Sequence, residues 1–207
     1  MKKLSLLFTK DGLQWHISKG KTVLEEAFHF VTEETSPHLV EEKLDDVLKF
    51  DDYKEIEVIS ALNHFSLTPD TFAEHELGYK LISYNAPVDE ANEELMLSVN
   101  KKFAVQFYYT FPKHFYQKIK AKKLPTKFNF SGEKFLNALT VKNHKEIHIN
   151  LYHHQVEFFA FENKKVALYN NLDADSEVDF LYFIMFSLSK INFGTAETHF
   201  HIYGETH

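Results

Sequence analysis

Two amino acids are missing from this 207-residue chain, which contains neither cysteine nor arginine. Without cysteine it can form no disulfide, thiolate zinc site, iron–sulfur cluster or cysteine nucleophile. Without arginine it has no arginine finger and no bidentate guanidinium clamp for phosphate. Its 23 basic residues, all lysine, face 30 acidic ones, and the net charge of −7 argues against general nucleic-acid binding.

Glycine and long apolar runs are also scarce. The six glycines are scattered, and no Walker loop, Gly-x-Gly-x-x-Gly or Gly-x-Ser-x-Gly motif occurs. The longest fully apolar run, residues 180–186, is too short to span a membrane. The apolar stretch after Lys2 and Lys3 is too short for a signal peptide, so we expect a cytoplasmic protein.

Apolar and aromatic residues are plentiful: 44% of the chain is hydrophobic and 21 residues are phenylalanine. This content is sufficient for a core, so we expect a globular protein of one large domain or two small ones.

The first part of the chain predicts three strands, a helix and a fourth strand. The strands are expected at residues 4–8, 13–18, 23–31 and 55–62. Asp11-Gly12 favours a tight hairpin turn between the first two strands. Ser36-Pro37 favours a helix start, because serine caps free amides and proline suits the first helical position.

The middle of the chain predicts shorter elements. Thr68-Pro69-Asp70 indicates a short helix that ends near Tyr79, and residues 95–110 indicate a hairpin. A helix over residues 112–122 and a strand over residues 128–130 follow. Ser131 is expected to cap a helix that ends near residue 141.

The C-terminal part repeats the first pattern. Strands are expected at residues 146–152, 156–161, 165–171 and 197–203, with a helix over residues 178–191 after a capping box at Ser176. That helix is apolar nearly all round, which predicts that it is buried between layers. The expected first and fourth strands start 51 residues apart in both copies, at residues 4 and 55 and at residues 146 and 197.

The predicted fold class is therefore α/β (mixed α+β), with two ribonuclease-H-like units of β-β-β-α-β pattern, mixed sheets and flanking helices. We expect a first domain over residues 1–142, with the hairpin at about 95–110 inserted in it. The second, abbreviated domain is expected over residues 143–207.

This repeated unit resembles the actin-like ATPase fold, in which two ribonuclease-H-like domains face each other across a cleft. The chain is similar to a bacterial domain-of-unknown-function family with a degenerate form of that fold. The resemblance rests on the hairpin at residues 4–17, the helix after Ser36-Pro37, and the closing sequence at residues 198–204.

The resemblance implies where a nucleotide would bind, because the first hairpin of each domain cradles phosphate in active members with an Asp and a Gly. Asp11 and Gly12 are the candidate residues here, although they stand at a turn where any hairpin would use them. The second hairpin, residues 152–155, has neither Gly nor Asp, and bulky side chains would block the approach of an anion. We therefore expect no cofactor, and neither ATP nor Mg²⁺.

Histidine suggests a metal site. His199 and His201 would share one face of a strand, with Glu197 beside them and His207 nearby, and this donor set suits zinc or nickel. A second, looser group contains His148, His153 and His154. The simpler interpretation of the first group is a polar sheet face under a helix or solvent. The second group would need a turn to bring its members together, because adjacent residues on a strand point to opposite faces.

Charge is unevenly distributed along the chain. Residues 25–57 carry a net charge of −9, and residues 113–134 carry +6 with aromatic residues between the lysines. Lysines interleaved with aromatics can bind single-stranded nucleic acid. A simpler hypothesis is that the acidic and basic faces meet, within the chain or between copies.

Taken together, these patterns favour a non-enzymatic protein-interaction or assembly module with an actin-like scaffold, which binds a protein partner or itself. One alternative is an atypical nucleotide-dependent ATPase or phosphotransferase that uses Asp11. A second alternative is a nucleic-acid-associated factor that uses the lysines of residues 113–134. The sequence does not identify a small-molecule ligand.

Overall fold

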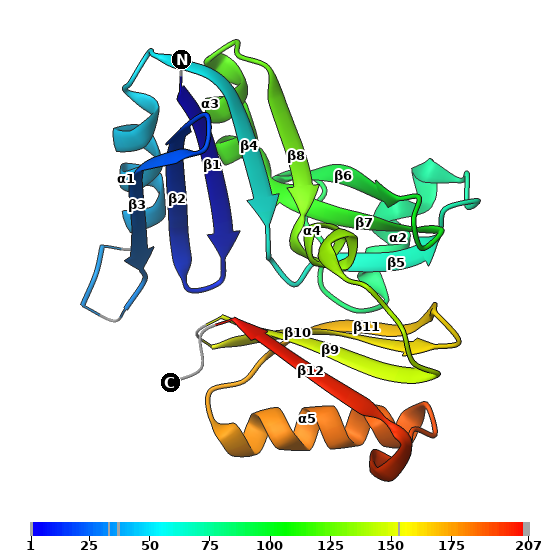
Figure 1. The fold of residues 1–207 in the computed structure, drawn as a ribbon. Coiled ribbons are helices and arrows are strands. Elements are labelled where there is room, and N and C mark those ends of the chain that lie inside the picture. Colours follow the sequence, from blue (N-terminus) through cyan, green and yellow to red (C-terminus); the bar gives the residue numbers. More distant parts are fainter. Residues whose placement is uncertain (1, 33, 37, 153, 205–207) are drawn as a thin grey trace. The chain divides into compact units, whose positions relative to one another are not determined.

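A computed structural model describes residues 2–32, 34–36, 38–152 and 154–204 (Figure 1). The chain forms two compact units. Unit 1 contains residues 1–99 and 105–133, and unit 2 contains residues 100–104 and 134–207. The expected division of the chain into two domains at residue 142 stays a prediction.

Unit 1 is built on a five-stranded mixed sheet. Strands β1 (Lys2–Thr9), β2 (Gly12–Lys19) and β3 (Thr22–Phe30) form an antiparallel meander. Helix α1 (Leu39–Leu48) then crosses over, and β4 (Tyr53–Ser60) pairs parallel to β1. Strand β8 (Thr126–Phe130) pairs parallel to β4, which gives the order β3-β2-β1-β4-β8. The predicted β-β-β-α-β unit is confirmed.

Helix α1 covers one face of this sheet with the apolar stripe that its sequence predicts. Leu44, Val47 and Leu48 are buried in a core with the inward side chains of β1, β2 and β4. The helix begins at Leu39, later than expected, and Ser36 does not cap it. The Ser36 hydroxyl instead accepts a hydrogen bond from the His38 amide and donates one to Glu42. Pro37 lies outside the described residues.

An insertion between β4 and β8 forms a second sheet with the order β5-β7-β6. Its elements are β5 (Phe65–Pro69), η1 (His75–Leu77), α2 (Gly78–Ser83), β6 (Glu93–Asn100) and β7 (Val105–Pro112). The expected hairpin at residues 95–110 is confirmed as β6 and β7. The expected helix start at Thr68-Pro69-Asp70 is wrong, because Thr68 and Pro69 pair with β7 as the end of a strand, and helical residues begin only at His75. Strand pairing outweighs the local helix-start signal here.

The acidic and basic regions meet inside unit 1. Helix α3 (Lys113–Ala121) follows β7. The Nζ of its Lys118 lies 2.9 Å from Oε1 of Glu41 and 2.7 Å from Oδ2 of Asp45, both on α1. Lys122 lies 2.6 Å from Asp51 just beyond α1. The predicted contact between oppositely charged faces therefore forms within the chain.

Unit 2 repeats the architecture with a four-stranded sheet. After α4 (Ser131–Ala138), strands β9 (Lys145–Tyr152), β10 (Gln155–Glu162) and β11 (Lys165–Asp173) form a second antiparallel meander. Helix α5 (Glu177–Lys190) and η2 (Thr195–Glu197) lead to β12 (His199–Gly204), which pairs parallel to β9. The order is β11-β10-β9-β12. The predicted cap is confirmed, since the Ser176 hydroxyl accepts a hydrogen bond from the Asp179 amide.

Helix α5 lies along one face of this sheet (Figure 1), and it is only half buried. Ile184 and Leu188 pack on Ile147 and Ile149 of β9. The expectation that the whole helix is buried between layers is wrong. Within unit 2 the sheet covers one side of α5, and the apolar side chains of the opposite side are between 48% and 74% exposed: Val178, Leu181, Tyr182, Met185 and Phe186.

No helix within the described ranges combines the length and apolar character that crossing a membrane requires.

Candidate functional site

The first candidate site is the β1–β2 hairpin, where Asp11 and Gly12 stand. Gly12 has φ of +145°, and a Cβ there would lie 1.9 Å from the carbonyl oxygen of His29 on β3. The Asp11 amide donates to the Thr9 hydroxyl, and its carbonyl accepts from the Val31 amide. The pairing of β2 with β3 thus explains why a glycine stands at this turn.

The second candidate phosphate hairpin joins β9 to β10, with Tyr152 paired to Gln155. The carbonyl of His154 accepts a hydrogen bond from the Ala174 amide, and His153 lies outside the described residues. No glycine stands in this turn to let a backbone amide approach an anion.

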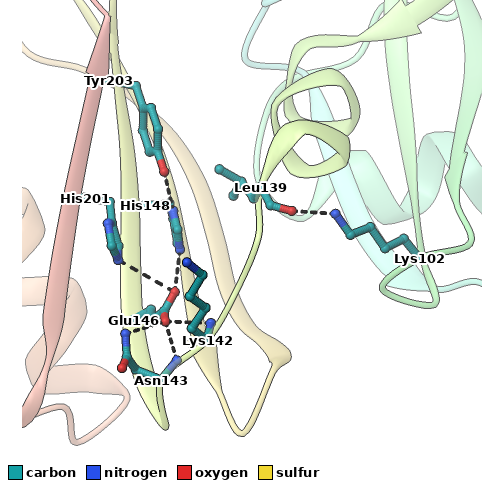
Figure 2. A network of polar contacts seen from close by, with 8 residues as sticks. All are labelled: Lys102, Leu139, Lys142, Asn143, Glu146, His148, His201 and Tyr203. Atoms are coloured by element: carbon teal, nitrogen blue, oxygen red, sulfur yellow. Dashed lines mark hydrogen bonds and ion pairs between the residues drawn. The ribbon is translucent and has the colours of Figure 1, made fainter.

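A polar cluster lies on the sheet face of unit 2 opposite α5 (Figure 2). It contains the buried Glu146 and His148 and the partly exposed His201. Glu146 and His148 are two residues apart on β9, so they share a face. The parallel register pairs His201 of β12 with His148. The sheet therefore brings His201, whose side chain is 42% exposed, to the cluster. His199 pairs with Glu146 in the same register but is exposed and is not one of the three clustered donors. His207 lies outside the described residues.

Hydrogen bonds fix the Glu146 carboxylate, which is 1% exposed. Its Oε1 accepts from the backbone amides of Lys142 and Asn143 and from the Asn143 side chain. Its Oε2 lies 2.8 Å from His148 Nε2 and 3.8 Å from His201 Nε2. Burial alone would raise the pKa of Glu146, but the donors from Asn143, His148 and Lys142 lower it to about 2.

His148 links this carboxylate to Tyr203, whose hydroxyl lies 2.9 Å from His148 Nδ1. Burial lowers the pKa of His148, Glu146 opposes that shift, and His201 adds to it. The neutral ring then donates from Nε2 to Glu146 and accepts from the Tyr203 hydroxyl at Nδ1. The ring of His148 lies nearly parallel to the rings of His201 and Tyr203, with interplanar angles of 14° and centroids 4.4 Å and 5.9 Å away.

The donor set of this cluster could hold a metal, since its three ligand atoms lie within 4.8 Å of one another. A pocket of about 340 Å³ opens beside them, with Thr140 and Lys142 in its wall. The two imidazole rings are nearly parallel, however, so their lone pairs do not converge on one point. A metal would also have to displace the proton between His148 and Glu146. As it stands, the geometry fits a hydrogen-bond network better than a metal centre.

The other face of unit 2 carries an exposed apolar surface. Phe200 and Ile202 pair with Ile147 and Ile149, so they point to the α5 side of the sheet, yet they are 42% and 54% exposed. We call these two residues and the exposed stripe of α5 the α5–β12 surface: Val178, Leu181, Tyr182, Met185, Phe186, Phe200 and Ile202.

Sequence reasoning missed Glu146 as a member of the polar cluster, and it missed the α5–β12 surface. The i, i+2 spacing of Glu146 with His148, and of His201 with Tyr203, was a usable signal. That signal becomes specific only when the parallel register of β9 and β12 is known.

The two sheets, each a three-stranded meander followed by a crossover helix and a parallel strand, define the class: the chain has the actin-like ATPase fold. A solved structure from Bacteroides thetaiotaomicron, described as a protein with actin-like ATPase fold and unknown function, superposes with a TM-score of 0.81. It is 20% identical, and the match covers 99% of this chain and 82% of that chain.

A second similar structure is the cytoplasmic domain of EpsL, an inner membrane component of the type II secretion system of Vibrio cholerae. Its TM-score is 0.56 at 9% identity, and the match covers 100% of this chain and 84% of that chain. At these identities the likeness shows the fold. No curated protein matches the chain.

The particular family is defined by the whole sequence. Residues 1–207 match the family described as protein of unknown function (DUF3822), and the chain belongs to that family. The resemblance inferred from the sequence pattern is confirmed.

Proposed function

We propose that this protein is a non-enzymatic interaction module, which takes its place in a protein assembly through unit 2. The observation that carries the proposal is the α5–β12 surface, where seven large apolar side chains are exposed on adjoining elements. Single exposed apolar residues are ordinary, but seven of them on the helix and the edge strand of one sheet face favour an interaction site.

The hairpins support the non-enzymatic part of the proposal. The missing side chain of Gly12 allows β3 to lie close to the turn, and the Asp11 amide donates a hydrogen bond to the Thr9 hydroxyl. The turn at residues 152–155 has no glycine. Both features argue against the backbone cradles for phosphate that nucleotide chemistry uses. A thermal-shift titration with Mg-ATP tests this part, because saturable stabilisation by several degrees would overturn it.

The lysines of residues 113–134 offer little support for nucleic-acid binding. Lys118 and Lys122 pair with acidic residues at α1, and Lys113 donates to the carbonyls of Glu90 and Ala91. Phosphate contacts would have to replace these bonds. EpsL offers a parallel for the assembly role, as a domain of this fold in a component of a secretion system.

The experiment is a comparison of native elution profiles of the tagged chain in extracts of its own cells. We expect the chain to elute in a complex much larger than its 24.3 kDa. The double variant Leu181→Glu/Met185→Asp should elute as a monomer. Tyr84→Glu is the matched control, because Tyr84 is a 71% exposed aromatic residue of unit 1. A complex that survives the double variant, or a parent chain that elutes as a monomer, contradicts the proposal.

A further inference from the structure

We infer that the α5–β12 surface binds a helix–strand segment of a partner protein, whose strand joins the edge of β12 and whose helix packs beside α5. This inference rests on the proposed function. It comes from a comparison of the two units, because unit 1 holds such a segment at the equivalent place.

The first correspondence between the two units is between strand β4 of unit 1 and strand β12 of unit 2. In unit 1, β8 pairs with β4 over residues 56–60, and adding 144 to these numbers gives residues 200–204 of β12. Ile56 and Val58 are each 1% exposed, whereas their counterparts Phe200 and Ile202 are 42% and 54% exposed. Within the described residues, β12 is the edge of its sheet. Its outer amides and carbonyls can therefore accept another strand.

The second correspondence is between helix α1 of unit 1 and helix α5 of unit 2. Adding 140 to the buried residues of α1 gives the buried residues of α5, that is, Leu44, Val47 and Leu48 correspond to Ile184, Ser187 and Leu188. The same shift places Leu181 and Met185 where α1 has Glu41 and Asp45. Those two acidic residues are the ones that Lys118 of α3 contacts. The exposed stripe of α5 thus lies where a helix packs in unit 1.

This equivalence specifies the chemistry of the partner segment. The helix should present apolar side chains to Leu181 and Met185, where α3 presents Lys118 to carboxylates. A strand of about five residues should follow the helix and run parallel to β12, as β8 follows α3. That strand should carry an apolar residue opposite Ile202, as Phe128 stands opposite Val58.

A second copy of this chain is a weaker occupant. Its own α3 and β8 are already held in unit 1, by ion pairs and by the pairing with β4. Two copies could bury α5 against α5, but this contact would leave the edge of β12 unpaired. The partner segment accounts for the open strand edge and the apolar helix stripe together.

The test uses the full chain and two synthetic peptides of residues 112–130. One peptide keeps the native sequence. The other carries Lys118→Leu to match Leu181 and Met185, and Lys122→Leu because its partner Asp51 corresponds to Ile191 under the same shift of 140. We expect saturable binding of the leucine peptide by fluorescence anisotropy, with a Kd roughly tenfold lower than that of the native peptide. In the chain variant Leu181→Glu/Met185→Asp, which restores the charges of α1, this preference should reverse.

Hydrogen exchange with the leucine peptide bound then tests the strand. We expect slower exchange of the amides of residues 200–204, and an Ile202→Asp variant should weaken binding roughly tenfold. Protection of α5 without protection of β12 would overturn the strand pairing. Equal affinity of both peptides for both chains, or no binding, would overturn the inference. A concentration-dependent dimer of the parent chain that the double variant abolishes would assign the surface to a second copy.

These outcomes separate the inference from the proposed function. If the cellular complex depends on Leu181 and Met185 while neither the peptides nor the β12 amides respond, the surface binds a partner of another kind. If the complex does not depend on them, the proposed function itself fails.

Discussion

The Nε2 of His148 lies 2.8 Å from the Oε2 of Glu146, and both side chains are 1% exposed. Glu146 accepts three further hydrogen bonds at Oε1, and Tyr203 satisfies the other nitrogen of His148. A buried carboxylate is stable only when such donors replace water. The cluster therefore anchors the loop at residues 142–143 to the start of β9.

Replacement of Glu146 by Gln should destabilise unit 2. An amide nitrogen would then face the N–H of His148, and the charge that strengthens the four hydrogen bonds would be lost. We expect a loss of about 2 kcal/mol in the free energy of unfolding, from urea titrations followed by far-UV circular dichroism. Trp15 lies in unit 1, so tryptophan fluorescence alone would miss the change. The exposed Glu162→Gln is the control and should change stability by less than about 0.5 kcal/mol; equal effects of both variants would contradict the network.

Acid should destabilise the protein in two steps at this cluster. The pKa of His148 is lowered in the fold, so the unfolded chain binds the extra proton first and stability falls as the pH drops below about 6.5. The pKa of Glu146 is lowered from 4.5 to about 2, so its contribution is present above pH 4.5 and is lost as the pH falls toward 2. Urea titrations between pH 8 and pH 3 measure both steps.

The two variants assign these steps. His148→Gln should reduce the loss of stability just below pH 6.5, where His29, whose pKa burial also lowers, adds its own part. Glu146→Gln should make the curve less steep below pH 4.5. Unchanged curves in both variants would show that other groups cause the acid sensitivity.

Gly12 offers a test of the hairpin. A Cβ at Gly12 would lie 1.9 Å from the His29 carbonyl oxygen, so Gly12→Ala must separate β2 from β3. We expect a loss of about 3 kcal/mol or failure to fold. Gly20→Ala is the control, because Gly20 has φ of +63° with open space around it, and should cost about 1 kcal/mol. If the Gly12→Ala protein is as stable as Gly20→Ala, the approach of β3 does not explain this glycine, and Gly12 is again a candidate for ligand binding.

The sequence could predict most strands and the crossover helices, because alternation and helical periodicity are local signals. It could not predict the pairing of Thr68 and Pro69 with β7, which depends on residues far along the chain. The same limit applies to the polar cluster, where His201 was predicted from β12 but its neighbours on β9 depend on the register. For α5, composition indicates an all-round apolar helix but cannot say how many of its sides the fold covers.

The difference between the two units makes a final prediction about stability. Val58 on β4 and Ile202 on β12 occupy equivalent positions, but Val58 is 1% exposed and Ile202 is 54% exposed. Val58→Ala should therefore cost about 2 kcal/mol of unfolding free energy, as a buried truncation does, while Ile202→Ala should cost less than about 0.5 kcal/mol. Urea titrations of the purified chain measure both. Once the leucine peptide is bound, Ile202 is buried, so Ile202→Ala should lower the affinity although it barely changes the free chain. A large loss of stability in the free Ile202→Ala chain would mean that the α5–β12 surface is already covered.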